Sequence, residues 1–446
     1  MRQWFKSFPD PRSVDVIQQL GVDFVILHSK AYSPEQWTQI MQDLPRYWFA
    51  VENIYTVGEA LVLKLVPPSC KPSSAAVNVR FQPAILDGLP NSLDVVFENT
   101  GPAAFVSDVR QVSRLNFANG AVKNFTEPLV VPPGARQYVT VPLTGESSAV
   151  NLLTADLASL QRTVSVPDPP PVSNISVDDW PRQSLGLAFV DGPQLAAYRL
   201  SAAEATPCTM VGLALEWVGG HPADRVLVQL TDPFGRVVFE SITRPWASAA
   251  QSSLDVHWLP VPGTTPPGQY GLRVWVQTAA GESRWPMTDE GVPLPPNQLP
   301  PVPLLIHPPQ GAVPAVPAVL FENGVQLRAE EPVDVVLQPG GWLRFDLTWQ
   351  VMQPVDTMVT VFTQLLGPDG RVWGQYDNQP GGGWYPFALW PAHRPVTESY
   401  AIQLSPDAPP GEYRLIAGLY EADTGVRILL STGGDFVDVG TIRVEQ

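Results

Sequence analysis

Proline is the feature of this sequence that most restricts how the chain can fold. Prolines make up 50 of the 446 residues, about twice the share found in an average protein. Because proline lacks a backbone N–H, it is rare in helix interiors and in central strands. Hydrophobic residues still make up 44% of the chain, which is enough for packed cores and excludes bulk disorder. We therefore predict many short strands joined by rigid loops, in about three domains for this length.

The charge balance and the hydropathy pattern narrow the function classes. The chain carries 27 basic and 43 acidic residues, a formal net charge of −16. This balance excludes a general binder of nucleic-acid backbones, because such proteins need a basic face. No stretch reaches 18 apolar residues, and residues 1–10 lack the apolar core of a signal peptide. We therefore expect a water-soluble chain without an export signal of its own.

Residue types that commonly act in catalysis, metal binding or disulfide formation are scattered along the sequence. The two cysteines, Cys70 and Cys208, fall in different predicted domains, so we expect neither a disulfide framework nor a bridge between them. The five histidines are too far apart for a helical zinc pair. Neither a phosphate-binding glycine loop with lysine nor a Gly-x-Ser-x-Gly elbow is present. We therefore predict no metal, no cofactor and no catalytic residue.

Residues 1–66 are predicted to form a small α/β unit. Ser33, followed by proline and with Gln36 three residues later, is a strong helix start. Val22–Leu27 is a nearly continuous apolar run, which is typical of a buried parallel strand. Helices are expected over residues 14–20 and 34–44, and strands over 22–27, 47–55 and 59–66. Such a sheet normally has earlier strands, so we expect the unit to be the end of a domain that starts before Met1.

After residue 67 the apolar residues alternate with period two, which indicates half-buried strands. Residues 75–166 contain short alternating segments separated by turns, which fits an immunoglobulin-like β-sandwich. Pro167–Pro171 has four prolines in five residues and is predicted to be a stiff linker. Two further segments follow, repeat 1 (184–307) and repeat 2 (313–446), which are predicted to be sandwiches related as an internal repeat.

The repeat is carried by three motifs that occur in the same order. They are an alternating apolar segment that ends in tryptophan, a Gly-Arg turn and a Pro-Pro-Gly-x-Tyr corner, at Val211–Trp217, Gly235–Arg236 and Pro266–Tyr270 in repeat 1 and Leu343–Trp349, Gly370–Arg371 and Pro409–Tyr413 in repeat 2. We predict the same strand order in both, with the tryptophans in the core and the tyrosines bonded to the preceding corner. The predicted fold is therefore mainly β: a small N-terminal α/β unit followed by three immunoglobulin-like β-sandwiches.

An aromatic segment in repeat 2 is the candidate ligand site. Six aromatic residues lie within 18 positions, more than one strand pair can bury on one face. Exposed rings of this kind stack on sugars, whereas buried rings pack under their own loop. We favour packing, and we expect Trp390 to be buried beside Phe387 and Trp384 to be the most exposed ring. A sugar-binding platform would instead require at least two of Trp384, Tyr385 and Trp390 to be exposed on one face. The candidate binding residues are Trp373, Tyr376, Trp384, Tyr385 and Trp390.

Two regions resemble a known family. The segments Phe8–Ser13, Leu20–Val22 and Phe24–His28 resemble a region near the C-terminal end of large bacterial membrane glycosyltransferases. These are polytopic enzymes that use lipid-linked sugars and are similar to protein mannosyltransferases. Repeat 2 resembles β-sandwich tails of some of these proteins, at Phe345–Trp349, Gly367–Arg371, Asp377, Pro380, Tyr385, Trp390, Pro409–Tyr413 and Gly418–Gly425. The resemblance covers residues 5–66 and 317–446 best and residues 184–290 weakly.

The resemblance implies a place outside the membrane and no catalysis by these residues. In that family the catalytic acidic residue and the lipid-carrier site belong to the membrane section, and neither has a counterpart here. The chain is therefore expected to be a non-catalytic exoplasmic tail that holds an acceptor, a glycan or another envelope component. Its contact with the membrane would come only through a section that precedes Met1. The parent protein would be the glycosyltransferase.

Two alternatives remain. The first is a free-standing multidomain surface protein that binds carbohydrate through the last sandwich, with the aromatic segment as its platform. The second is a hydrolase on a sandwich scaffold, which is disfavoured because the sequence shows no convergent acid, base or nucleophile.

Overall fold

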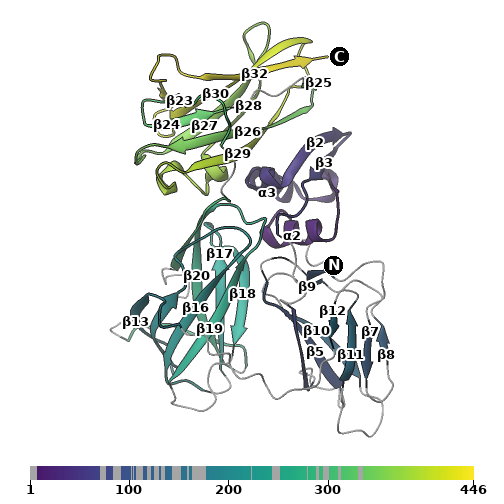
Figure 1. Cartoon of the computed structure of the whole chain (residues 1–446), viewed down its shortest axis with the longest axis vertical. Coiled ribbons are helices and arrows are strands. Elements are labelled where there is room, and N and C mark those ends of the chain that lie inside the picture. The colour runs from purple at the N-terminus through teal and green to yellow at the C-terminus, as the bar shows by residue number, and fades with distance from the viewer. Residues whose placement is uncertain are drawn as a thin grey trace. The chain divides into compact units, whose positions relative to one another are not determined.

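The computed structural model shows a mainly β chain (Figure 1), which confirms the predicted fold class. The residues that it describes are 8–70, 77–83, 92–101, 103, 105–106, 114–117, 122–124, 130–131, 136–142, 152–157, 160–162, 177–221, 224–243, 252–278, 280–287, 291–294, 301–309, 313–329 and 335–445. The predicted linker Pro167–Pro171 lies outside the described residues.

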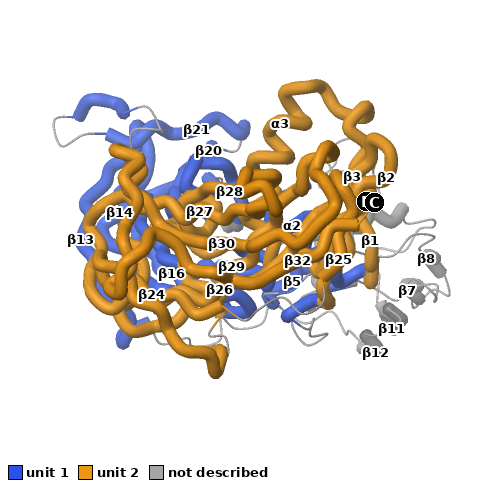
Figure 2. The backbone as a smooth tube through the Cα atoms, turned by 90° about the horizontal axis from the view of Figure 1, so that it is seen from above, with its two compact units in different colours: residues 1–20, 68–265, 270–305 blue, residues 21–67, 266–269, 306–446 orange. Residues whose placement is uncertain are grey.

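The chain divides into two compact units, each assembled from segments that are distant in sequence (Figure 2). Unit 1 contains residues 1–20, 68–265 and 270–305, and unit 2 contains residues 21–67, 266–269 and 306–446. We call residues 1–66 the N-terminal region. Its strands group with repeat 2, although repeat 2 follows them by more than 200 residues.

The first helix, α2 (Pro11–Gln19), belongs to unit 1. Asp10 caps it by accepting hydrogen bonds from the first-turn backbone, and Pro11 occupies the first helical position, where a missing N–H has no cost. The chain leaves the helix through Gly21, whose φ of +69° lies in the left-handed region. Thr264 Oγ1 donates a hydrogen bond to the Pro11 carbonyl (2.6 Å), which ties the helix to repeat 1.

A disulfide joins Cys70 to Cys208, with Cα atoms 5.5 Å apart, so the expectation of two unbridged cysteines was wrong. The two cysteines meet because the chain runs along repeat 1 directly after residues 1–66. Ser69 Oγ donates to the Gly263 carbonyl at 3.5 Å, and a Cβ on Gly263 would lie only 2.6 Å from the Cys70 sulfur. Residues assigned to different domains by sequence are therefore neighbours in unit 1.

In unit 2 the N-terminal region forms a three-stranded sheet with one helix. The elements are β1 (Phe24–His28), η1 (Ser29–Ala31), α3 (Pro34–Asp43), η2 (Leu44–Ala50), β2 (Val51–Val57) and β3 (Ala60–Leu65). The strand order is β1-β3-β2 and all pairs are antiparallel. The predicted capping box of α3 is present, with Ser33 and Gln36 bonded reciprocally to the backbone.

Two predictions for this sheet were wrong. The run 22–27 was expected to be a buried parallel strand, but β1 is an antiparallel edge strand, with Phe24 and Ile26 exposed by 50% and 56%. A short apolar run does not reveal pairing direction or which faces are covered. The strand expected from Tyr47 begins only at Val51, because residues 44–50 form the short helix η2.

Unit 1 also contains two sheets from the region predicted as the first sandwich, with strand orders β10-β5-β4 and β12-β11-β7-β8, and a separate pair β6-β9. The strands are β4 (Val77–Pro83), β5 (Ser92–Asn99), β6 (Phe105–Val106), β7 (Arg114–Phe117), β8 (Val122–Asn124), β9 (Val130–Val131), β10 (Arg136–Pro142), β11 (Leu152–Leu157) and β12 (Leu160–Arg162).

Repeats 1 and 2 have the same topology. Repeat 1 contains β13 (Arg182–Ala188), β14 (Gln194–Leu200), β15 (Glu204–Ala205), β16 (Thr209–Val218), β17 (Arg225–Thr231), β18 (Val237–Thr243), β19 (Ser253–Val261), β20 (Gly268–Gln277), β21 (Ser283–Arg284) and β22 (Val302–Ile306). Repeat 2 contains β23 (Val319–Leu320), β24 (Val325–Arg328), β25 (Val336–Leu337), β26 (Trp342–Val351), β27 (Val359–Leu366), β28 (Val372–Asn378), β29 (Pro395–Gln403), β30 (Gly411–Glu421), β31 (Arg427–Ile428) and β32 (Val437–Val444).

The strand orders match element by element. Repeat 1 has sheets β13-β14-β16-β19 and β15-β22-β20-β17-β18, and repeat 2 has β23-β24-β26-β29 and β25-β32-β30-β27-β28. The additional strands β21 and β31 pair with β20 and β30. The predicted identity of strand order is confirmed.

The repeats also share their core anchors. Trp217 packs on Phe189 with ring centroids 5.9 Å apart, and Trp349 packs on Phe321 at 6.1 Å; both tryptophans are buried, as predicted. Tyr413 Oη donates to the Pro409 carbonyl at 2.7 Å, which confirms the predicted corner in repeat 2.

Replacing Trp349 with alanine should destabilise repeat 2 by about 3–5 kcal/mol, as for a large buried aromatic side chain. The indole also donates a hydrogen bond to Tyr400 Oη (2.9 Å), which the variant loses. Native-state hydrogen exchange of β26 and β30 amides measures the change. Val372→Ala, at an exposed position of the same repeat, should stay within about 0.5 kcal/mol. A loss below about 1 kcal/mol for Trp349→Ala would show that it is no core anchor.

Candidate functional site

The structure places the predicted aromatic segment mostly inside unit 2. It runs from β28 through two short helices, η5 (Pro380–Gly383) and η6 (Phe387–Leu389), to β29. Trp384, Tyr385 and Trp390 are only 3%, 0% and 6% exposed. The exposure that a sugar platform requires is therefore not met by these three rings, and the expectation that Trp384 is the most exposed ring was wrong.

The aromatic rings of the segment pack on one another. Trp390 packs on Phe387 and stacks on Tyr385, with centroids 4.9 and 5.5 Å away, so the prediction that Trp390 packs beside Phe387 is confirmed. Trp390 Nε1 donates to the Tyr385 carbonyl at 2.8 Å. Trp373 and Tyr376 are half-buried on β28, and the Trp373 indole donates to Asp369 Oδ1 at 3.0 Å.

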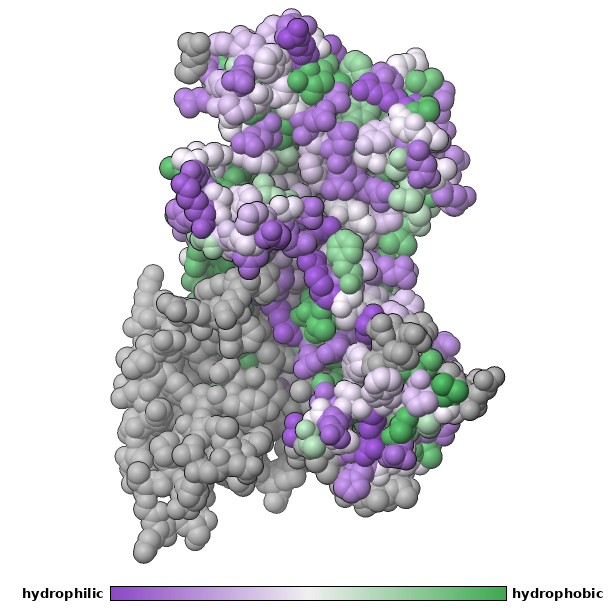
Figure 3. All heavy atoms as spheres, turned by 180° about the vertical axis from the view of Figure 1, so that it is seen from behind, coloured by the Kyte–Doolittle hydropathy of each residue, from purple (hydrophilic) through white to green (hydrophobic). Residues whose placement is uncertain are grey.

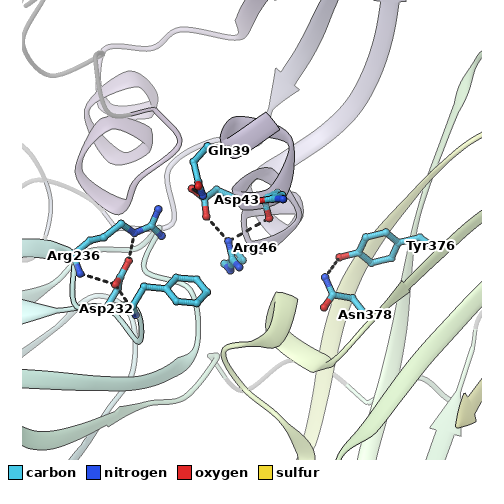
Figure 4. A network of polar contacts seen from close by, with 9 residues as sticks. Gln39, Asp43, Arg46, Asp232, Arg236, Tyr376 and Asn378 are labelled. Carbon is cyan, nitrogen blue, oxygen red and sulfur yellow. Dashed lines mark hydrogen bonds and ion pairs between the residues drawn. The ribbon is translucent and has the colours of Figure 1, made fainter. Parts of the chain in front are cut away.

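Arg46 of η2 covers Trp384. Its guanidinium carbon lies 4.7 Å from the Trp384 ring centroid, a cation–π geometry. Arg46 also forms an ion pair with Asp43, which accepts a second hydrogen bond from Gln39 Nε2 at 2.9 Å (Figure 4). Gly382 permits the approach of η2, because it has φ of +62° and a Cβ there would lie 2.5 Å from Arg46 Cγ. Burial of Trp384 thus depends on a helix that lies more than 300 residues earlier in the chain.

A polar network lies beneath η5. Glu398 on β29 accepts hydrogen bonds from Tyr400 Oη (2.6 Å) and from the Gly381 backbone N–H. The carboxylate is enclosed by protein although the residue retains some exposure, and burial raises its pKa above the ordinary value. Burial, together with the nearby Glu398 charge, raises the pKa of Tyr400 well above its ordinary value. Burial raises the pKa of Tyr376 to about 12, and its Oη accepts from Asn378 Nδ2 (Figure 4).

Sequence reasoning missed Glu398, although the internal repeat contains a signal for it. In repeat 1, Asp255 and His257 form a buried pair with 2.9 Å between Oδ2 and Nε2. Asp255 pairs across the sheet with Leu215 of β16, just as Glu398 pairs with Leu347 of β26. Both repeats therefore place an acid at the same register, bonded to an aromatic side chain two residues later.

A cleft of about 410 Å³ lies elsewhere in unit 2. The β2–β3 hairpin and helix α3 form one wall, and the start of β26 with the end of β29 forms the other. It is lined by Ser29, Lys30, Trp37, Met41, Thr56, Gly58, Glu59, Ala60, Leu61, Trp342 and Gln403. None of these residues was a predicted site residue, because the two walls of the cleft are nearly 300 residues apart in the sequence.

Among the described residues, no three His, Cys, Asp or Glu side chains gather in a way that could hold a metal ion. The described helices include none that is long and apolar enough to cross a membrane. On the face seen in Figure 3, hydrophobic residues are scattered among hydrophilic ones over the coloured part of the surface.

Comparisons with known proteins give no family. No protein-family model matches the chain, and no curated protein matches it. Similar solved structures include a family 123 glycoside hydrolase from Clostridium perfringens, with a TM-score of 0.17 and 9% identity over 25% of this chain and 22% of that chain. An alpha-2-macroglobulin from Escherichia coli has a TM-score of 0.17 and 10% identity over 97% of this chain and 28% of that chain. The chain thus spans less than a third of either protein, and TM-scores this low identify no relative.

Stability should depend on pH through Glu398. Because its folded-state pKa is raised, the folded state binds its proton more tightly than the unfolded state, so stability falls as pH rises through and above the ordinary value. As pH rises above the ordinary glutamate pKa of about 4.3, wild type should lose stability relative to Glu398→Gln in urea unfolding of the full chain. Glu412→Gln removes an exposed carboxylate of the same repeat and is the matched control. Parallel pH curves for wild type and Glu398→Gln would contradict the assignment.

Proposed function

We propose that this chain works outside the cytoplasm as a non-catalytic region associated with a bacterial membrane glycosyltransferase that uses lipid-linked sugars. Its role is to hold an acceptor glycan or another envelope component near the enzyme. The glycosyltransferase association rests on the resemblance of residues 5–66 and repeat 2 to that family. The extracytoplasmic location rests on the disulfide.

The Cys70–Cys208 disulfide is the observation that carries this proposal. Disulfides form and persist in oxidising environments such as the periplasm or the cell surface, and are rare in the cytosol. The bridge closes a loop with a sequence separation of 138 residues, so it restricts the unfolded chain strongly. A structural bridge of this kind supports residence outside the cytoplasm.

A holding role is supported by the open cleft of unit 2, whose volume is within the range of about 300–1,000 Å³ typical of small-molecule sites. The alternative of a free-standing surface protein with the aromatic segment as its sugar platform receives less support, because Trp384, Tyr385 and Trp390 are buried.

The full chain prepared from an oxidising compartment should contain no thiol that titrates after denaturation, and two after reduction. The Cys70→Ser, Cys208→Ser double variant should be less stable by about 2–5 kcal/mol, the usual cost of losing a native bridge. Thiol titration and urea unfolding are the measurements. Two titratable thiols in the unreduced chain would remove the support for an extracytoplasmic location.

The purified chain should bind envelope polysaccharide without transferring sugar. Cosedimentation with insoluble cell-wall sacculi and with purified envelope polysaccharides measures binding, and a polyprenyl-linked sugar donor in detergent tests for transfer. Heat-unfolded chain is the binding control. Turnover above background would overturn the non-catalytic assignment, and absence of binding to every polysaccharide would overturn the holding role.

A further inference from the structure

We propose that the cleft between the β2–β3 hairpin and the β26 edge of repeat 2 is a binding site for a neutral saccharide. This inference deepens the proposed function, on which it rests, by naming a site and a ligand class. The cleft lies wholly within unit 2, and its lining combines two tryptophans with short polar side chains and one ion pair.

The two tryptophans are suited to sugar rings. Trp37 and Trp342 are half-buried and both line the cleft, so each keeps apolar ring surface in contact with solvent. Sugar rings present apolar C–H faces, and removing such surfaces from water together is favourable. Most other tryptophans of unit 2, including Trp48, Trp349 and Trp384, are buried. Trp37 and Trp342 therefore provide the accessible indole surface that lines the cleft.

The Trp342 ring is held in place before any ligand arrives. Its Nε1 donates a hydrogen bond to Thr56 Oγ1 at 3.2 Å, and its centroid lies 6.2 Å from that of buried Trp48. Trp37 packs beside Tyr32, with centroids 6.0 Å apart. Because a hydrogen bond and ring packing already fix Trp342, its side chain loses little conformational freedom when a ligand binds. This lowers the entropic cost of association.

The polar groups of the lining favour a neutral ligand rich in hydroxyl groups. Lys30 Nζ and Glu59 Oε2 are 2.6 Å apart, and both side chains are exposed at the rim. They are the two charged residues of the lining and cancel each other, so nothing there selects for a phosphate or a carboxylate. Gln403 adds an exposed amide. Its Nε2 donates one hydrogen bond to the Gly340 carbonyl at 3.2 Å, and the second N–H and the carbonyl oxygen can donate to and accept from hydroxyl groups.

The test uses the full chain with maltohexaose, cellohexaose and mannohexaose as neutral probes, and with hexagalacturonate as an anionic probe. Isothermal titration should show at least one neutral probe binding with a Kd of about 10⁻⁴–10⁻³ M, a range expected for two stacked rings after association costs. The anionic probe should bind more weakly. Trp37→Ala and Trp342→Ala should each weaken binding about tenfold, a typical contribution of one buried aromatic contact.

Trp285→Ala is the matched control, because it removes an exposed tryptophan from unit 1 and should leave the Kd unchanged. Should an alanine variant fail to fold, Trp37→Phe and Gln403→Ala test the same cleft, and hydrogen exchange of wild type should show ligand protection at residues 56–61. If polysaccharides cosediment with the chain but cleft variants bind normally, the cleft assignment fails while the proposed function stands. If no saccharide of any kind binds, both fail.

Discussion

The contact of η2 with repeat 2 is the interaction on which the rest of unit 2 depends. Arg46 covers the Trp384 ring, and Trp48, two residues later, packs on Trp342. A guanidinium over an indole contributes about 0.5–2 kcal/mol, and the buried ring area adds to it. This contact buries the aromatic segment and positions the β2–β3 hairpin opposite β26. The same packing that removes one aromatic surface from solvent therefore creates the cleft.

The two repeats show how one fold acquires different local properties. The corner tyrosine follows the core tryptophan by 53 positions in repeat 1 and by 64 positions in repeat 2. Strand order and core anchors are the same. In repeat 2 the chain between β28 and β29 forms η5 and η6. This segment encloses Glu398 and contains Trp384, whose ring contacts Arg46 of η2. The additional length is therefore used in loops, where it does not disturb the sheets.

In unit 1, helix α2 and the segment around Cys70 are both attached to repeat 1. Capping by Asp10 starts α2, Thr264 holds the helix on repeat 1, and the disulfide fixes Cys70 to Cys208. The Thr264 hydrogen bond and the disulfide connect parts of the chain that the sequence had assigned to separate domains. Long-range contacts of this kind leave no periodicity or local spacing to detect, because each partner lies in a different segment.

The sequence by itself determined the elements whose causes are local. Alternation with period two specified the strands, Ser33 and Gln36 specified the start of α3, and the repeated motifs specified two sheets of identical order with buried Trp217 and Trp349. Only the tertiary structure decided that β1 pairs antiparallel at an edge, that the cysteines meet, that Trp384 is covered and that Trp37 and Trp342 share a cleft. Burial and proximity depend on which distant surfaces pack together, and an isolated local pattern is compatible with several such packings.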